Sequence, residues 1–265
     1  MSLANPPPAT PDPWATLRAH TSARIALGRT GTSLPTRALL AFQVDHARAM
    51  DAVYAELDRT ALAKQLQHAG LDSIALDTAA DSRTIYLQRP DAGRKLDEVS
   101  RERLRAYVDA HDQPEVVVAI VDGLSAIAAQ AHAVPVAVEL TNRLRASGLR
   151  VGGVPLVRYG RVAVQDELGE IMGARVVVSL IGERPGLGSP DSLGAYLVFN
   201  PRSGNTDAQR NCVSNIRPAG LTYAAAIDAL VWLSTTALRR ALSGVALKDD
   251  RPLGATSSHL DGLVS

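Results

Sequence analysis

The chain has 265 residues and a mass of 28.0 kDa, of which 46% is hydrophobic and 21% charged. This composition is typical of a globular protein and excludes disordered and fibrous classes. The length allows two domains, each with its own core. With 28 Lys and Arg against 27 Asp and Glu, the net charge of +1 gives no general attraction to nucleic acid or to an anionic membrane, so neither is expected as a partner.

The cysteine count predicts a reducing compartment. Cys212 is the single cysteine, so no internal disulfide can form, and a cytoplasmic protein is expected. The N-terminus shows no charged segment followed by an apolar one. The most apolar later stretch, 223–238, is interrupted by Asp228. We therefore expect neither a signal peptide nor a segment that spans a membrane.

The N-terminal part of the chain is expected to be mainly helical. Residues 1–13 carry five prolines and predict a flexible arm. Residues 14–113 predict a helical domain, with helices at about 36–57, 61–69 and 94–110. In the first helix the apolar residues recur every three or four positions, which predicts that one face is buried: Leu40, Val44, Ala47, Met50, Tyr54 and Leu57.

From residue 114 the pattern changes to alternating strands and helices. Residues 114–245 therefore predict an α/β domain with a Rossmann-like, doubly wound and mostly parallel sheet, followed by a loose tail at 246–265. The β-branched run 115–121 predicts a strand buried on both faces. The other expected elements are strands at 154–158, 161–164, 175–181 and 195–199, and helices at 125–147 with a break at Pro135, at 165–172 and at 222–242.

Ligands of open α/β sheets bind at the carboxyl ends of the strands, so the segments that follow Val121 and Ile181 are the candidate sites. The loop 182–192 combines glycines and prolines with Glu183 and Arg184. The spacing of its glycines matches neither a Walker A loop nor a dinucleotide-binding loop. The segment is either a crossover loop with an exposed Glu-Arg pair or a binding loop. Asp122, after the first strand, either holds a ligand or accepts hydrogen bonds from turn amides.

The remaining candidates are weaker. Arg24, Arg29 and the Gly- and hydroxyl-rich stretch 28–33 predict either a grip on an anion or on a partner's carboxylates, or an N-terminal capping turn. Cys212 has no neighbouring histidine, so we expect a small buried apolar group that can still contact a ligand. No zinc-binding spacing joins the histidines: His20, His46, His68, His111, His132 and His259. The sequence therefore predicts no metal site and no catalytic group, as in a cofactor-binding or partner subunit.

Several blocks of sequence carry a family resemblance, among them Gly28-Arg29-Thr30-Gly31-Thr32-Ser33, Val121-Asp122-Gly123-Leu124-Ser125 and Arg210-Asn211-Cys212-Val213-Ser214-Asn215. Together with the blocks at 42–48, 89–96, 159–163 and 182–188, they follow one another in the same order over residues 21–243. In this the chain resembles the small (light) subunit of ethanolamine ammonia-lyase, the adenosylcobalamin-dependent enzyme that converts ethanolamine to acetaldehyde and ammonia. Met50, where a basic residue is expected, departs from the pattern.

The resemblance implies a division of labour between two kinds of subunit. A large TIM-barrel subunit would carry the substrate and the radical chemistry, and this lyase subunit, inactive alone, would close over the cobalamin at their interface. It implies cofactor contacts by Val162, Glu183 and Cys212, with no catalytic residue in this chain. It also implies six large and six small subunits, which act in ethanolamine catabolism in the cytoplasm or in a bacterial microcompartment.

Two further expectations concern the cofactor and the alternative function. The Asp-x-His-x-x-Gly pattern that supplies a cobalt-binding histidine is absent, since the nearest match, 109–114, ends in Pro114 and precedes a strand. Cobalamin is therefore expected base-on, with its own dimethylbenzimidazole on cobalt. From the residues alone, a self-contained α/β transferase or hydrolase using Asp122, Glu183 and Arg184 is the alternative, and a structural scaffold is a third reading.

Overall fold

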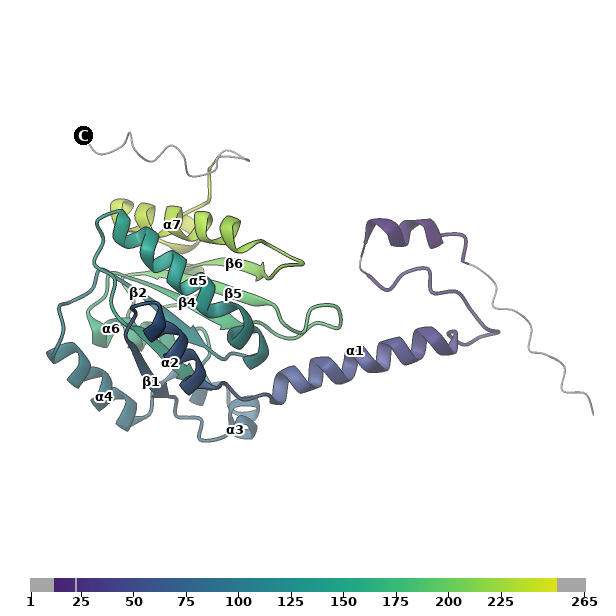
Figure 1. Ribbon diagram of the computed structural model, residues 1–265, viewed down its shortest axis with the longest axis horizontal. Coiled ribbons are helices and arrows are strands. Elements are labelled where there is room, and N and C mark those ends of the chain that lie inside the picture. The colour runs from purple at the N-terminus through teal and green to yellow at the C-terminus, as the bar shows by residue number, and fades with distance from the viewer. Residues whose placement is uncertain (1–11, 22, 252–265) are drawn as a thin grey trace, which may run out of the picture.

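A six-stranded sheet forms the centre of the computed structural model, which describes residues 12–21 and 23–251 (Figure 1). The strands lie in the order β1-β3-β2-β4-β5-β6; the first four are parallel, and β5 and β6 are antiparallel to their neighbours. Their bounds are β1 (Ser73–Asp77), β2 (Val116–Val121), β3 (Val154–Arg158), β4 (Val176–Gly182), β5 (Leu193–Phe199) and β6 (Arg210–Ile216). The fold is mixed α/β with a mostly parallel sheet, as predicted.

Helices cover both faces of this sheet (Figure 1). On one face lie α2 (Arg59–His68), α5 (Ala126–Ala146) and α7 (Tyr223–Arg240), and on the other lie α4 (Glu98–Asp109) and α6 (Val164–Met172). Strands β2 and β4 run between these layers, and every one of their residues is buried. The β-branched runs at 115–121 and 175–181 therefore form the central strands, as their composition predicts.

Strand β1 comes from the part of the chain that was expected to be helical. It pairs in parallel with β3, from Ser73 opposite Val154 to Asp77 opposite Arg158. The flanking helices α2 and α4 also pack against the sheet. The expected change of structure at residue 114 is therefore not a boundary of the sheet, because the sheet includes residues from both sides of it. Most of the expected arm, 1–13, and of the expected tail, 246–265, lies outside the described residues.

Helix α5 passes through Pro135 without a break, which corrects the sequence analysis. Proline has no N–H, so the carbonyl of Ala131, one turn earlier, loses its helical donor. Ala131 lies on the exposed side of the helix, where water can supply that hydrogen bond. The buried side of α5 keeps its intact apolar surface against β2 and β4.

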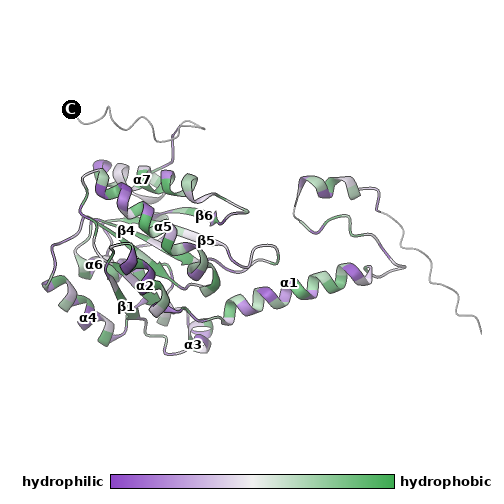
Figure 2. Cartoon of the chain, in the orientation of Figure 1, coloured by the Kyte–Doolittle hydropathy of each residue, from purple (hydrophilic) through white to green (hydrophobic). Residues whose placement is uncertain are grey.

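Helix α1 (Thr36–Tyr54) extends away from the sheet and its layers (Figure 1). The predicted helix is confirmed, and Leu57, just beyond its end, is buried as predicted, but the prediction is wrong for the five apolar residues within the helix. Within the helix only Ala52 is buried, whereas Leu40 and Tyr54 are 56% and 60% exposed. The reason is that α1 meets the rest of the described chain near its C-terminal end, where Ala52 is buried and α5 is the helix it contacts. Figure 2 shows the resulting alternation of polar and apolar residues along the projecting helix.

The Gly-rich stretch before α1 is a tight turn, closed by hydrogen bonds in both directions between the backbones of Thr30 and Ser33. No side chain caps α1, which starts directly after Pro35, so the expected capping turn is wrong in that respect. Arg24 instead forms an ion pair with Oδ2 of Asp45. The other carboxylate oxygen, Oδ1, lies 3.3 Å from Arg48. This pairing holds the preceding segment along one side of the helix.

Candidate cofactor site

Two adjoining hollows open at the carboxyl ends of strands β2, β3 and β4. One, of about 390 Å³, is lined by Glu183 among others, and the other, of about 560 Å³, is lined by Cys212. Arg161, Val162 and Tyr196 line both hollows. The structure thus brings Val162, Glu183 and Cys212 to one surface, although they are far apart in the sequence.

Val162 lies in a turn that enters α6, which corrects the predicted strand at 161–164. The N–H of Val164 donates to the carbonyl of Arg161 at 2.9 Å, and that of Gln165 donates to the carbonyl of Val162 at 3.2 Å. Tyr159, before the turn, has a φ of 57°, a left-handed conformation that a non-glycine residue rarely adopts. Such a conformation needs support from its surroundings, and a buried carboxylate supplies it.

That carboxylate is Asp122, which is fully buried at the end of β2. Its two oxygens accept hydrogen bonds from the N–H groups of Tyr159 at 2.8 Å and Gly160 at 3.0 Å, and the guanidinium of Arg83 lies 3.6 Å away. Burial raises the pKa of Asp122 to about 6, although the backbone donors and Arg83 act in the opposite direction. Of its two expected roles, Asp122 therefore takes that of accepting hydrogen bonds from backbone amides of a turn. Because it is fully buried, it cannot reach a ligand as an acid or base.

Glu183 points inward, so the reading of an exposed Glu-Arg pair is wrong. Its Oε2 accepts hydrogen bonds from Ser192 Oγ at 2.5 Å and from the Asn215 N–H at 3.3 Å. A Cβ on Gly194 would come within 2.7 Å of Glu183 Oε1, so this glycine makes room for the carboxylate. Among the described residues no donor occupies Oε1, whereas Arg184 is exposed and forms no ion pair with Glu183. Glu183 is thus fixed by one oxygen and free to accept with the other.

The loop 183–192 is held by the N-terminal part of α5. At its far end, Ser125 Oγ donates to the carbonyl of Pro190 at 2.8 Å, and His132 Nε2 lies 3.5 Å from a carboxylate oxygen of Asp191. The other ring nitrogen of His132 lies 2.6 Å from the hydroxyl of Tyr223, at the start of α7. This role of His132 could not be predicted, because a single histidine within a helix gives no sign of the distant loop it contacts.

Cys212 is exposed on β6, directly opposite Tyr196 on β5. The prediction of a buried cysteine is wrong, since the residue lines a hollow. Partial burial against the pocket wall is the main cause that raises the pKa of the thiol; the nearby charge of Glu183 adds to this, and a hydrogen bond with Tyr196 opposes it. The sulfur is therefore a neutral, polarisable contact surface at physiological pH rather than a nucleophilic thiolate.

A buried ion pair lies beneath the Cys212 side of the site. Arg210, at the start of β6, donates to Asp166 on α6 at 2.5 Å, and the two residues are 8% and 2% exposed. Burial raises the pKa of Asp166 to about 6, while the charge and the hydrogen bond of Arg210 lower it. This pair connects the strand of Cys212 with the helix that follows Val162.

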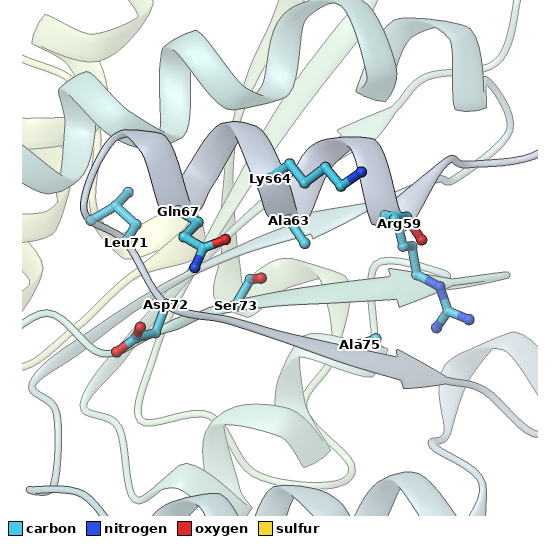
Figure 3. Close-up of a pocket in the computed structure, with 9 residues that line it drawn as sticks. Arg59, Ala63, Lys64, Gln67, Leu71, Asp72, Ser73 and Ala75 are labelled. Carbon is cyan, nitrogen blue, oxygen red and sulfur yellow. The ribbon is translucent and has the colours of Figure 1, made fainter.

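Another hollow, of about 500 Å³, lies between α2 and the edge strand β1, far from the predicted residues (Figure 3). Arg59 at its end is already used, because it donates to the carbonyl of Leu76 at 2.8 Å and lies 3.2 Å from Asp77. Figure 3 shows Lys64 and Gln67 on the helix above Ser73 of the strand. This groove runs along the edge strand β1 and presents no buried polar group that lacks a hydrogen-bond partner. We therefore assign no ligand to it.

Within residues 12–21 and 23–251, no group of three or more His, Cys, Asp or Glu is placed to hold a metal ion. Among the helices within these residues, none is both long enough and apolar enough to cross a membrane. His111, in the nearest match to a cobalt-binding motif, precedes β2 and stacks on Tyr107 at the opposite edge of the sheet. His259 lies outside the described residues.

Comparison with known proteins identifies the family. The family described as ethanolamine ammonia-lyase light chain (EutC) matches residues 11–248. The ethanolamine ammonia-lyase small subunit of Azotobacter vinelandii is 52% identical over 256 residues, 96% of this chain and 93% of its own length. The small subunits of Pseudomonas fluorescens and Pseudomonas aeruginosa are each 51% identical, over 94% and 95% of this chain and 91% of their own lengths. The chain therefore belongs to the ethanolamine ammonia-lyase light-chain family.

Proposed function

We propose that this chain is the small subunit of an adenosylcobalamin-dependent ethanolamine ammonia-lyase, with its Rossmann-like sheet edge closing over one side of the cobalamin. Val162, Glu183 and Cys212 contact the cofactor, and a TIM-barrel large subunit holds its other side and the substrate. The complex contains six subunits of each kind and acts in the cytoplasm or in a bacterial microcompartment. Membership of the family supports the role, and the shape of the site supports the cofactor.

The main support for this proposal is the size of the two hollows compared with the size of the cofactor. Drug-sized ligands are enclosed by pockets of roughly 300–1,000 Å³, and the two hollows have volumes of about 560 and 390 Å³. A corrinoid is several times larger than such a ligand, so these hollows can receive only its rim. The rest of the molecule must lie against another surface, as expected for a cofactor held between two subunits.

The residues at the hollows fit a corrinoid chemically. The corrin ring carries amide side chains, whose N–H groups can donate to the free Oε1 of Glu183. Val162 presents an apolar side chain, since its carbonyl is used by Gln165, and Cys212 adds a soft, neutral sulfur. Adenosylcobalamin supplies radical chemistry when bound. This chain binds and orients the cofactor and excludes water from one side of it.

The first prediction is that only the complex is active. Because the proposed large subunit binds the substrate and carries the radical chemistry, the purified chain with adenosylcobalamin should give no acetaldehyde from ethanolamine. Mixing it with the large subunit should restore turnover. Turnover by the chain alone, after the absence of any large subunit has been verified by mass spectrometry, would contradict the proposal.

The second prediction concerns Glu183. Replacing Glu183 with Ala should weaken cobalamin binding by the reconstituted complex by about 1.5–3 kcal/mol, because a charge-assisted hydrogen bond is lost. Cobalamin titration monitored by visible absorption measures this loss. Glu183→Gln, which keeps a carbonyl acceptor, should lose less, and Glu139→Ala on the exposed face of α5 is the matched control. Equal affinities for the Glu183→Ala and Glu139→Ala complexes would remove Glu183 from the site.

The third prediction is that cobalamin binds base-on. None of the histidines of the described chain lines either hollow, so no imidazole is placed there to replace the dimethylbenzimidazole on cobalt. Electron paramagnetic resonance of the cob(II)alamin complex with ¹⁵N-labelled small subunit measures the axial nitrogen. Coupling to unlabelled cofactor nitrogen is expected. Coupling to ¹⁵N from this chain would refute the prediction.

A further inference from the structure

Helix α1 and the residues before it carry most of the exposed apolar surface of the described chain. We call residues 12–21 and 23–54 the α1 segment. Nine of the exposed large hydrophobic side chains lie in it, and the other three, Val99, Ile127 and Val245, are scattered elsewhere. The nine are Trp14, Leu17, Leu34, Leu39, Leu40, Phe42, Val44, Met50 and Tyr54. An exposed concentration of this kind marks an interaction surface.

The apolar residues of α1 form a stripe on one side of the helix. Leu40, Val44, Met50 and Tyr54 recur at helical spacing and are each 47–60% exposed. The opposite side carries Asp45, which pairs with Arg24 and Arg48. The charged side therefore contacts the chain's own N-terminal segment, and the apolar stripe remains without a partner in the described structure.

The α1 segment cannot be held in place by its own packing. No residue from 12 to 51, among those described, is buried. In proteins most of the stability of a helix comes from the packing of its apolar face, and in α1, a helix of 19 residues, only Ala52 is buried. Burial of the apolar stripe on a partner would supply the missing stabilisation.

The base of the helix lies beside the candidate cofactor site. Arg83 donates to the carbonyl of Val53 at 2.5 Å and to the carbonyl of Gly123 at 2.8 Å, and Gly123 lines the Glu183 hollow. Just after α1, Glu56 accepts a hydrogen bond from the hydroxyl of Tyr159 at 3.1 Å. The helix thus leaves the molecule at the edge where the hollows open, and a protein that covers them would also meet the helix.

The segment is shared with relatives that are named small subunits. The family match begins at residue 11, and an alignment over 96% of the chain must include most of the α1 segment. The segment has five arginines, three aspartates and no lysine or glutamate, so its partner surface should be apolar with acidic groups at its margin. With a net charge of +1, a second copy of this chain offers no overall acidic excess for such a margin.

From these observations we infer that the apolar stripe of α1 docks on the large subunit, in an interface continuous with the cofactor site. The inference rests on the proposed function. It makes the α1 segment an attachment device that works before and without cobalamin. The two subunits then meet at the α1 stripe as well as around the cofactor.

The test measures binding of the cobalamin-free chain to the purified large subunit. The double variant Leu40→Glu, Val44→Glu should bind at least tenfold more weakly than the unsubstituted chain. Val99→Glu, on exposed α4, is the matched control and should bind within twofold. The substituted side chains are exposed, so the melting temperature should stay unchanged. In the complex, the amides of residues 36–51 should exchange with solvent more slowly than in the free chain.

The outcomes separate this inference from the proposed function. If the unsubstituted chain does not bind the large subunit at all, the proposed function fails. If it binds and the double variant binds equally well, with unprotected amides at 36–51, only the docking inference is overturned. A different result would show that the stripe binds a second copy of this chain instead. In that case the free chain is a dimer by light scattering, whereas the double variant is a monomer that binds the large subunit with unchanged affinity.

Discussion

Replacing Asp122 with Ala should lower the free energy of unfolding by roughly 3–5 kcal/mol, because a buried pair is broken and its partners keep no substitute. Two buried N–H groups, of Tyr159 and Gly160, lose their acceptors, and Arg83 loses its counter-charge. Urea unfolding at neutral pH measures the change. Asp81→Ala, an exposed carboxylate on the surface, is the control and should lie within about 0.5 kcal/mol of the unsubstituted chain. A loss below 1 kcal/mol for Asp122→Ala would contradict the anchoring role.

The same carboxyl should make stability depend on pH with a defined sign. Its pKa is raised to about 6 in the folded chain, so the folded state binds the proton more tightly than the unfolded state does. Stability from this group is therefore present at low pH and is lost as the pH rises through 6. The free energy of unfolding of the native chain relative to Asp122→Asn should fall between about pH 4 and 6 and then stay level. A difference that rises over this range would reverse the assignment.

Replacing Arg210 with Ala should also lower stability by roughly 3–5 kcal/mol, because Asp166 stays buried without its partner. The double variant Asp166→Leu, Arg210→Met should recover part of this loss, since two apolar side chains need no hydrogen bonds. The effect on cobalamin should differ. Both variants remove the connection between β6 and α6, so the complex should bind cobalamin more weakly even where stability is recovered.

Denaturant titration and cobalamin titration of the same three proteins separate these effects. Arg202→Ala, at an exposed arginine in the loop between β5 and β6, is the matched control for both measurements. If the double variant recovered cobalamin affinity together with stability, the ion pair would have only a structural role. If neither variant changed stability, the pair would be energetically neutral.

The central strands and long helices of this fold were predictable, and the edges of the sheet were not. β2 and β4 are β-branched runs buried on both faces, which is a strong and local pattern. β1 has only five residues and β6 has only Arg210 and Ile216 buried. In β1 the buried residues Ile74 and Leu76 do alternate with less buried ones, but an alternation over five residues is too short to identify a strand. The pairing of the edge strands depends on neighbours that are distant in the chain.

The candidate site shows the same division. Its place at the ends of β2 and β4 followed from general sheet architecture, and Glu183 lies in the loop that composition had singled out. The roles of Asp122, His132 and Arg210 did not follow, because each depends on a contact with a segment more than 30 residues away. The amphipathic pattern of α1 was read correctly as a helix, but periodicity does not reveal whether the apolar face meets this chain or another.

The position of β1 at the sheet edge has a consequence for the order of events during synthesis. Within the described chain β1 pairs with β3 alone, so the pairing of Asp77 with Arg158 can form only after residues 154–158 have left the ribosome. At roughly 5–20 residues per second this takes on the order of 4–15 s. During that time the nascent chain carries an unpaired strand together with the apolar α1 segment. Until β3 joins β1, the nascent chain therefore has both of the features that make incompletely folded chains prone to aggregation.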